Sequence, residues 1–262
     1  DDRVRKISFT GSVEVGKKIC AVAGLKRVTM ELGSNSPLIV LPDADLDKVA
    51  AAVVATGYAD AGQVCISTQR VIALDRVYDD LLSRVQAAVG KIIPGDPLNV
   101  ATTMGPMIRE RDAERVAAWI QEAKSQGARV VCGGERTGTL VPPTLVADVR
   151  PQMRISCDEL FGPAVGVTRV ENIAEALAVA NDSRYGLSAG IFTQDIDAAL
   201  HLAQRIESGN IHINWGPGWR ADLMPYGGLK ESGFGKEGPR YAIQEMTELK
   251  TVVVHLSEPR NG

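Results

Sequence analysis

Two side chains capable of covalent and acid–base chemistry stand out in the first quarter of the chain, a cysteine at position 65 and a glutamate at position 31. Cys65 comes just after Gly62, and a thiol at such a glycine turn, near free backbone N–H groups, can be held as a thiolate. Glu31 lies in the strand-like run 28–32, where a buried carboxylate needs a partner or a function. A thiolate is a nucleophile and a carboxylate tuned by burial is a general base, so the two residues predict covalent catalysis at sulfur.

Each of these two residues also has a structural explanation. A free cysteine is most often a small buried hydrophobe. A glutamate at the end of a strand is often held in a salt bridge. The sequence leaves both alternatives open for Cys65 and Glu31.

The segment that must position Cys65 reads as an amphipathic helix. It opens at Asp43-Ala44-Asp45, and Gly62 ends it and lets other backbone pass close to the thiol. The helical spacing places five apolar side chains on one face: Leu46, Val49, Ala50, Val53 and Val54. This pattern predicts a buried helix face that leads to a turn presenting Cys65.

The rest of the chain alternates between strand-like and helix-like runs. We expect strands near 7–9, 28–32, 38–41, 70–73, 128–132, 140–146, 164–170, 189–192 and 209–213, and helices near 13–23, 78–89, 110–125, 171–180 and 196–206. Such alternation predicts an α/β fold with a largely parallel sheet. A last strand, 251–256, could lie on a sheet edge and pair with another chain. The aromatic and glycine-rich loop 214–235 is too long to be a mere connector.

A glycine motif follows the first expected strand. Gly11 and Gly16-Lys17 have the spacing of a P-loop, but that motif needs Ser or Thr next to hold Mg²⁺, and Lys18 stands there. A nucleoside triphosphatase is therefore disfavoured. Gly11 and Ser12, at the N-terminus of a helix, can still bind the phosphate of another cofactor through N–H groups and the helix dipole.

A second polar motif is Glu159-Leu160-Phe161-Gly162-Pro163. A carboxylate beside an aromatic can accept a hydrogen bond from a ribose and pack on a ring. A capped turn before a strand explains the same residues.

Composition excludes several classes of protein. Among 262 residues, 45% are hydrophobic and 23% charged, as in an ordinary globular protein, and the net charge of −3 with scattered Lys and Arg argues against nucleic-acid binding. No apolar run approaches the roughly 20 residues of a membrane span. The four cysteines are far apart and the three histidines form no ligand motif, so we expect no metal site. Reduced thiols suggest a cytoplasmic protein.

The motifs in their order resemble the NAD(P)-dependent aldehyde dehydrogenase superfamily. The resemblance rests on Phe9–Ser12, Glu31–Gly33, Gly62–Cys65, Glu159–Pro163 and Pro225–Lys230, and is supported by 181–187 and 232–235. It extends to the C-terminal half of such an enzyme, and the chain starts at Asp1 on a strand-like run without a methionine. We therefore expect a fragment, with a fold consisting of an aldehyde-dehydrogenase-like catalytic domain and the tail of a dinucleotide-binding domain.

The resemblance implies a role for each motif residue. Cys65 would attack the aldehyde, pass through a thiohemiacetal and a thioester, and supply a backbone N–H to the oxyanion hole; Glu31 would activate the water that hydrolyses the thioester. The cofactor, NAD or NADP, would be bound by six residues, namely Gly11 and Ser12 near the pyrophosphate and adenosine, Leu32 and Gly33 along the nicotinamide pocket, Glu159 at the nicotinamide ribose and Phe161 beside the nicotinamide.

The resemblance also predicts how the chain is organised. Residues 1–32 would be the remnant of the dinucleotide-binding domain, 33–235 the catalytic domain, and 236–262 a segment that returns to the cofactor domain or forms an oligomerisation arm in a homodimer or homotetramer. The family's second oxyanion donor, an asparagine, and its adenosine-contacting lysine would lie before Asp1. We expect little activity from this chain alone.

The substrate class is open. By analogy, the loop 215–222 borders the substrate entrance, where Trp219 and Arg220 could meet an anionic semialdehyde, although a solvated Arg220 beside Asp222 is the more common arrangement. Two rival functions also stay open: a cofactor-independent thiol esterase, and a non-catalytic fragment that mediates oligomerisation.

Overall fold

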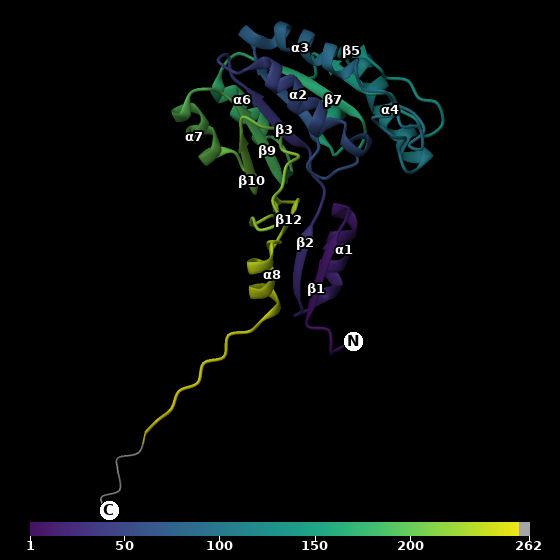
Figure 1. The fold of residues 1–262 in the computed structure, drawn as a ribbon. Coiled ribbons are helices and arrows are strands. Elements are labelled where there is room, and N and C mark those ends of the chain that lie inside the picture. Colours follow the sequence, from purple (N-terminus) through teal and green to yellow (C-terminus); the bar gives the residue numbers. More distant parts are fainter. Residues whose placement is uncertain (257–262) are drawn as a thin grey trace, which may run out of the picture.

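The apolar runs of the chain pair into one seven-stranded sheet with the strand order β10-β9-β3-β4-β7-β6-β5. The computed structural model describes residues 1–256 (Figure 1). The strands are β3 (Ser36–Val40), β4 (Thr68–Leu74), β5 (Arg129–Cys132), β6 (Thr144–Ala147), β7 (Ala164–Val170), β9 (Ser188–Phe192) and β10 (Asn210–Ile213). Every neighbouring pair is parallel except β5 with β6, which confirms the expected α/β class.

Helices cover both faces of this sheet, because successive strand residues point to opposite sides. Leu38 and Val40 of β3 belong to the core under α2 (Leu46–Gly57), α3 (Asp75–Val89) and α4 (Glu110–Ser125). Ile39 of β3 belongs to a second core under α6 (Ile173–Asn181) and α7 (Ile196–Arg205). The result is three layers, helix on sheet on helix (Figure 1).

A smaller sheet lies below this body and has the order β1-β2-β12. Its strands are β1 (Lys6–Thr10), β2 (Arg27–Glu31) and β12 (Gly233–Phe234), and β1 and β2 are parallel strands joined by α1 (Val13–Ala23). The short β12 runs antiparallel to β2. Val13, Met30 and Leu32 form a separate small core with Tyr185, which reaches over from the larger body.

The remaining elements are short and lie around the junction of the two sheets. They are the 3-10 turn η1 (Ala59–Gly62), α5 (Arg154–Cys157), β8 (Tyr185–Gly186), β11 (Leu229–Lys230) and α8 (Pro239–Met246), with β11 pairing antiparallel to β8. The long loop 214–235 thus contains β11 and β12, which tie it to both parts of the fold.

The two sheets are connected by the buried segment Leu32–Asn35, which follows β2 and leads into β3. The segment is held from β4. Gln69 Nε2 donates to the Ser34 carbonyl at 3.4 Å, and Arg70 Nε donates to the Asn35 carbonyl at 3.1 Å. Arg70 also donates to the carbonyls of Val179 and Ala180, at the end of α6.

Arg70 is 3% exposed and makes its hydrogen bonds to carbonyl oxygens. Burial lowers the pKa of Arg70 to about 10, so the guanidinium stays charged at neutral pH. The partially negative C-terminal end of α6 compensates this buried charge in place of a carboxylate.

Most expected elements are present, and two expectations are wrong. The strand expected at 140–146 begins only at Thr144, because Pro142 and Pro143 have no N–H to give to a ladder. The helix expected to end at Gly62 ends at Gly57, where the chain enters a tighter turn. Residues 251–256 form no strand within this chain and extend, exposed, away from both sheets (Figure 1), and their pairing with another chain stays a prediction. The expected domain limits at residues 32 and 235 stay a prediction.

Within residues 1–256, no helix combines the length and apolar character needed to cross a membrane. The same residues contain no group of three or more His, Cys, Asp and Glu side chains arranged to hold a metal ion.

The role of Arg70 leads to a stability prediction. We expect Arg70→Lys to lower the free energy of unfolding by about 3 kcal/mol, because an ammonium cannot reach three carbonyls in three directions and leaves buried acceptors unpaired. Urea unfolding at pH 7 measures this change. The matched control is Arg76→Lys, at an exposed position on the neighbouring α3, which should change stability by less than about 0.5 kcal/mol. Equal effects at both positions would contradict the prediction.

Candidate active site

A cleft of about 600 Å³ lies between the two sheets. Its lining contains all eight residues expected to act on the substrate's carbonyl or to bind the cofactor: Gly11, Ser12, Glu31, Leu32, Gly33, Cys65, Glu159 and Phe161. Five further residues line the cleft: Thr10, Gln63 and Val64, which belong to the expected motifs but had no assigned role, and Arg115 and Trp119, which no motif indicated. The fold therefore brings together motifs that are up to about 150 residues apart in the chain.

Cys65 reaches the cleft through a left-handed turn. After α2 ends at Gly57, Asp60 and Ala61 adopt φ values of 49° and 55°, and Gly62 follows with φ 68°. A Cβ on Gly62 would lie 2.5 Å from the carbonyl carbon of Gly162 and 3.0 Å from the nitrogen of Pro163. As the sequence indicated, the glycine lets backbone approach closely, and here it packs the cysteine turn against the segment that carries Glu159 and Phe161.

The Cys65 thiol is only partly buried and its Sγ lies 3.5 Å from the hydroxyl of Tyr226. Burial, the largest influence, raises the pKa of the Cys65 thiol; the charges of Glu159 and Glu31 raise it further, and the hydrogen bond with Tyr226 lowers it. Burial and the nearby carboxyl groups therefore oppose the thiolate that the turn was expected to favour, while the Ile66 backbone and the Tyr226 hydroxyl support it. Neighbouring carboxylates and desolvation outweigh the backbone N–H groups. The position on a cleft wall also argues against a purely structural cysteine.

Glu31 is 5% exposed, and neither of its carboxyl oxygens has a hydrogen-bond partner among the described residues. The salt-bridge explanation for this glutamate is therefore wrong. Burial is the main cause that raises the pKa of Glu31 to about 8; Glu237 adds to the effect, and Lys236 and Arg220 oppose it. Glu31 is thus largely protonated at neutral pH, and its two buried carboxyl oxygens have no hydrogen bond that would offset their desolvation.

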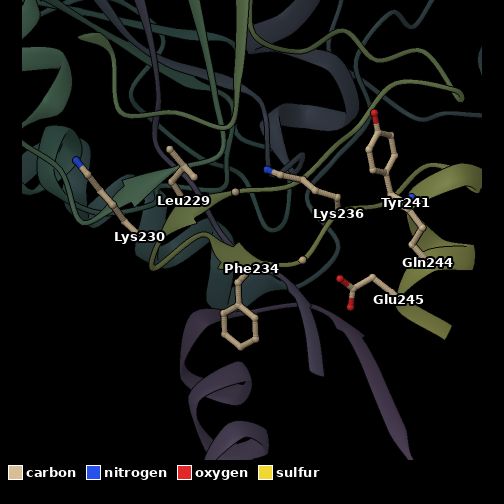
Figure 2. A pocket seen from close by; sticks show the side chains of 10 residues that line it. Leu229, Lys230, Phe234, Lys236, Tyr241, Gln244 and Glu245 are labelled. Carbon is tan, nitrogen blue, oxygen red and sulfur yellow. The ribbon is translucent and has the colours of Figure 1, made fainter. Parts of the chain in front are cut away.

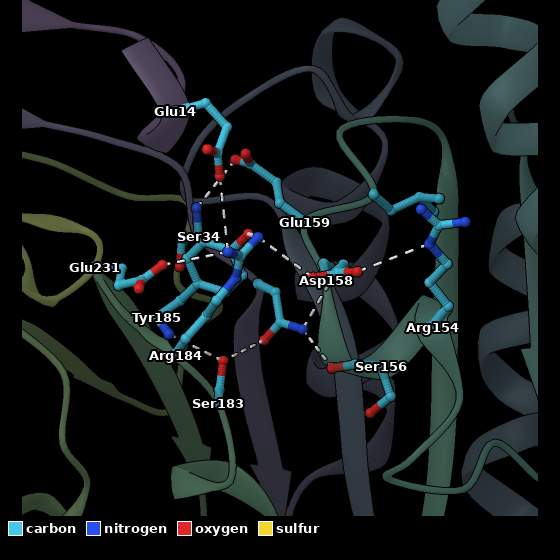
Figure 3. Close-up of polar contacts among 12 residues, drawn as sticks. Glu14, Ser34, Arg154, Ser156, Asp158, Glu159, Ser183, Arg184, Tyr185 and Glu231 are labelled. Atoms are coloured by element: carbon cyan, nitrogen blue, oxygen red, sulfur yellow. Dashed lines mark hydrogen bonds and ion pairs between the residues drawn. The ribbon is translucent and has the colours of Figure 1, made fainter. Parts of the chain in front are cut away.

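Glu159 holds its carboxyl group against the crossing segment. The Ser34 N–H donates to Glu159 Oε1 at 3.0 Å (Figure 3). Gly33 permits this approach, because a Cβ there would lie 2.6 Å from the Glu159 carboxyl carbon. Burial raises the pKa of Glu159, while the Ser34 hydrogen bond and the charges of Arg115 and Arg184 lower it. The bond to Ser34 engages only one of the two carboxyl oxygens, and the carboxyl group lines the cleft.

Arg184 connects the elements around Glu159 (Figure 3). Its guanidinium forms ion pairs with Asp158 at 3.4 Å, with Glu231 at 3.3 Å and with Glu14 of α1 at 3.9 Å. It also donates to the Tyr185 hydroxyl at 2.8 Å. One arginine therefore ties α1, the turn before Glu159 and the β11–β12 loop to each other.

The N-terminus of α1 opens onto the same cleft. Ser12 caps the helix by accepting a hydrogen bond from the Val15 N–H at 3.4 Å, and Gly11 donates its N–H to the Glu31 carbonyl at 3.0 Å. The first turn of a helix leaves N–H groups without intrahelical partners and carries a partial positive charge. This end of α1 is suited to an anion such as a phosphate.

Arg220 and Trp219 lie outside the cleft lining. Arg220 Nη1 forms an ion pair with Glu237 at 2.7 Å, so its partner is Glu237 rather than Asp222. The Arg220 guanidinium carbon lies 4.6 Å from the centre of the Tyr226 ring. Trp219 packs edge-on against His212, with ring centroids 6.1 Å apart. Arg220 is therefore connected to Cys65 through one intervening side chain, that of Tyr226.

A separate hollow of about 530 Å³ lies between β12 and α8 (Figure 2). It is lined by Lys236, Tyr241 and Glu245 among others, and includes neither Cys65 nor Glu31. Figure 2 shows Lys236 and Phe234 extending in different directions from the β12 segment. Lys236 Nζ donates to the Gly227 carbonyl at 2.6 Å. Burial lowers the pKa of Lys236, and the charge of the nearby Glu31 carboxyl group partly opposes this lowering.

Comparison with known proteins agrees with this arrangement. A model of the aldehyde dehydrogenase family matches residues 1–252. The chain belongs to the aldehyde dehydrogenase family. One relative, the 3-sulfolactaldehyde dehydrogenase of Priestia megaterium, is 44% identical over 253 residues, which cover 97% of this chain and 53% of that protein. The chain spans about half the length of the curated relatives it matches.

Two solved structures of aldehyde dehydrogenases show the same fold. The NAD-dependent aldehyde dehydrogenase from Sinorhizobium meliloti superposes with a TM-score of 0.94 at 39% identity, covering 99% of this chain and 52% of that one. The glyceraldehyde-3-phosphate dehydrogenase from Methanocaldococcus jannaschii, solved in complex with NADP, has a TM-score of 0.94 at 36% identity, covering 97% and 55%. The resemblance inferred from the motifs is confirmed.

The raised pKa of Glu31 makes a prediction about stability and pH. Its ordinary value is 4.5 and its value in the folded aldehyde dehydrogenase chain is about 8. Folding favours the protonated acid, so this contribution to stability is complete below about pH 4.5 and is lost as the pH rises to about 8. Glu31→Gln cannot ionise, and we expect its advantage in urea midpoint over the unchanged protein to grow from pH 5 to pH 9.

The control for this experiment is Glu135→Gln, at an exposed glutamate. Its difference in urea midpoint should stay the same at both pH values. If the difference in urea midpoint between Glu31→Gln and the unchanged protein is the same at pH 5 and pH 9, the prediction of a raised Glu31 pKa is wrong.

Proposed function

We propose that this chain carries the nucleophile and the base of an enzyme that oxidises an aldehyde to a carboxylic acid with NAD or NADP as hydride acceptor. The observation that carries the proposal is the convergence of a partly buried thiol, Cys65, and an unpaired acid, Glu31, on one cleft. Membership of the aldehyde dehydrogenase family supports it.

The residues of the cleft are suited to a dinucleotide. The N-terminal end of α1, which follows Gly11 and Ser12, would bind the pyrophosphate, and the Glu159 carboxylate would accept hydrogen bonds from the nicotinamide ribose. Leu32, Gly33 and Phe161 would line the nicotinamide ring. When bound there, NAD(P)⁺ supplies an acceptor for the hydride that leaves the substrate carbon.

Cys65 would act first. Its sulfur, after losing the thiol proton to solvent, forms a bond to the aldehyde carbon, and the carbonyl oxygen becomes an oxyanion that the Cys65 backbone N–H stabilises. Loss of a hydride from this thiohemiacetal leaves a thioester on Cys65. Splitting the oxidation in this way turns the second half of the reaction into the hydrolysis of an activated ester.

Glu31 would act in the second half. As a carboxylate it takes a proton from water while the water oxygen bonds to the thioester carbon; the carbon–sulfur bond then breaks and the acid is released. A pKa of about 8 makes Glu31 a stronger base than an ordinary carboxylate, at the cost of being mostly protonated at pH 7. Hydrolysis of the thioester is therefore expected to become faster as the pH rises toward 8.

Two variants of the full-length protein test the roles of Cys65 and Glu31. We expect Glu31→Gln to release at most one equivalent of NAD(P)H per thiol and then to stop, because the thioester forms but is not hydrolysed. Cys65→Ser should release none. Stopped-flow absorbance at 340 nm and intact-protein mass, which would show the acyl group, measure both outcomes.

Two results would overturn the proposal. One is steady turnover by Cys65→Ser at the unchanged rate. The other is ester hydrolysis without cofactor and no aldehyde oxidation with it, which would instead favour a thiol esterase. The cleft lining contains no histidine, the usual base of such an enzyme.

We also propose that the aldehyde carries an anionic group. The names of two of the relatives above specify a sulfonate and a phosphate on the aldehyde, and the chain offers Arg220, with Trp219 beside it in the sequence, over the ring of Tyr226, whose hydroxyl contacts Cys65. A guanidinium fork suits such anions. We further propose, from membership of the family, that the protein assembles as a homodimer or homotetramer.

The anion proposal is tested by Arg220→Gln with two aldehydes of equal size, one anionic and one neutral. We expect the ratio of kcat/KM for the anionic over the neutral aldehyde to fall about 10-fold, the effect of losing one charge-assisted hydrogen bond. Taking a ratio removes any effect on the thiol itself. An unchanged ratio would assign anion recognition to other residues.

A further inference from the structure

The Cys65 sulfur has one side-chain hydrogen-bond partner among the described residues, the hydroxyl of Tyr226, at 3.5 Å. Tyr226 is 4% exposed and packs in a small core with Ile66 and Leu187, against which Cys65 and Val64 also lie. Its backbone is fixed by two hydrogen bonds with Glu237: the Glu237 N–H donates to the Tyr226 carbonyl at 2.7 Å, and the Tyr226 N–H donates to the Glu237 carbonyl at 3.3 Å. The phenol is therefore held in place independently of Cys65.

A cation lies over the same phenol. The Arg220 guanidinium carbon is 4.6 Å from the ring centre, and Glu237 holds Arg220 in that position through an ion pair of 2.7 Å. A cation on the face of an aromatic ring is attracted to its π electrons and withdraws electron density from the ring. The hydroxyl of a phenol polarised in this way is a stronger hydrogen-bond donor.

We propose that the Tyr226 hydroxyl donates the hydrogen bond that holds the Cys65 sulfur as a thiolate, and that Arg220 strengthens this donor through the phenol ring. The inference rests on the proposed function, in which Cys65 is the nucleophile, and deepens it by naming a residue that sets the acidity of the thiol. Tyr226 contacts the reacting atom, and Arg220 is a positioning residue.

The charges around Cys65 explain why such a donor is needed. Burial and the carboxyl groups of Glu159 and Glu31 all oppose ionisation of the thiol. The groups that favour the thiolate are the Tyr226 hydroxyl and the Ile66 backbone. When the thiol ionises, its proton goes to solvent and the sulfur can only accept, so Tyr226 must be the donor.

Tyr226 keeps its own proton at neutral pH. Burial raises the pKa of its hydroxyl strongly, and the charges of Cys65 and Glu31 raise it further, while Arg220 lowers it. The hydroxyl therefore acts as a fixed donor and does not transfer its proton to the sulfur. This arrangement differs from a cysteine–histidine pair, in which the partner takes the thiol proton.

The test is Tyr226→Phe, which keeps the buried ring and removes the hydroxyl. We expect the pH midpoint of Cys65 alkylation by iodoacetamide to rise by about one unit, the loss of one hydrogen bond to a charged acceptor. The whole pH profile should be fitted, because a thiolate of higher pKa is also more nucleophilic and the rate at one pH understates the shift. Peptide mass spectrometry assigns the alkylation rate to each cysteine separately.

Arg220→Gln extends the test and keeps the phenol. We expect a smaller rise of the same midpoint, and no additional rise when Arg220→Gln is combined with Tyr226→Phe, because the cation acts through the hydroxyl. A full additional rise in the double variant would mean that Arg220 acts on the sulfur directly. A midpoint of Cys65 alkylation unchanged in Tyr226→Phe would overturn the inference.

Two controls exclude a general loosening of the structure. Tyr241→Phe removes a hydroxyl from α8, away from Cys65, and should leave the midpoint unchanged. Cys20, Cys132 and Cys157 are alkylated in the same samples, and their rates should not differ among the variants. Because alkylation needs neither aldehyde nor cofactor, a midpoint shift without aldehyde oxidation would reject the proposed function and retain the inference about the thiol.

Discussion

The hydrogen bonds that Arg70 and Gln69 make to the crossing segment Leu32–Asn35 are the constraint on which the cleft depends. A buried irregular segment must satisfy its backbone polar groups within the protein. Here β4 supplies those partners, since Arg70 bonds to the Asn35 carbonyl and Gln69 to the Ser34 carbonyl. Gln69 also accepts from the Leu160 N–H at 2.9 Å. The same two strand residues thus fix the segment after Glu31 and the turn that carries Glu159.

The burial of side chains around the cleft also determines the pKa values of its ionisable groups. The pKa values of Glu31, Glu159 and Cys65 are all raised, and in each case burial is the largest cause. Three acids that share a desolvated space resist ionising together. The opposing groups differ, however: the Ser34 N–H bonds to the Glu159 carboxyl group, the Tyr226 hydroxyl bonds to the Cys65 sulfur, and the Glu31 carboxyl group has no hydrogen-bond partner within residues 1–256. When the surroundings of neighbouring acids differ in this way, their pKa values differ, and the acids can take different roles in a reaction.

The spacing of apolar residues along the sequence predicted most helices and strands. The features that it did not predict depend on contacts between residues far apart in the chain. Helices 13–23 and 110–125 and strand 164–170 have the bounds expected from periodicity, because their apolar spacing is encoded in adjacent residues. The motif residues of the cleft could be predicted through the family resemblance. Arg115 and Trp119 could not be predicted as cleft residues, because an arginine and a tryptophan one helical turn apart also occur on many helices that only pack against a neighbour. The direction of the Cys65 pKa shift depends first on burial and then on Tyr226 and on carboxyl groups far away in the sequence, which no local pattern reveals.

Under the proposed function, Arg220 would link the recognition of an anionic substrate to the ionisation of the Cys65 thiol. A guanidinium has five N–H donors, and of those on Arg220 only Nη1 takes part in a hydrogen bond within the described part of the chain. Its side chain is 40% exposed, so the remaining donors can meet a ligand while the plane stays over the Tyr226 ring. An anion bound there would share the guanidinium charge with Glu237 and Tyr226. It would weaken the polarisation of the phenol, so binding of a charged substrate and the acidity of Cys65 would be coupled through the Arg220 side chain.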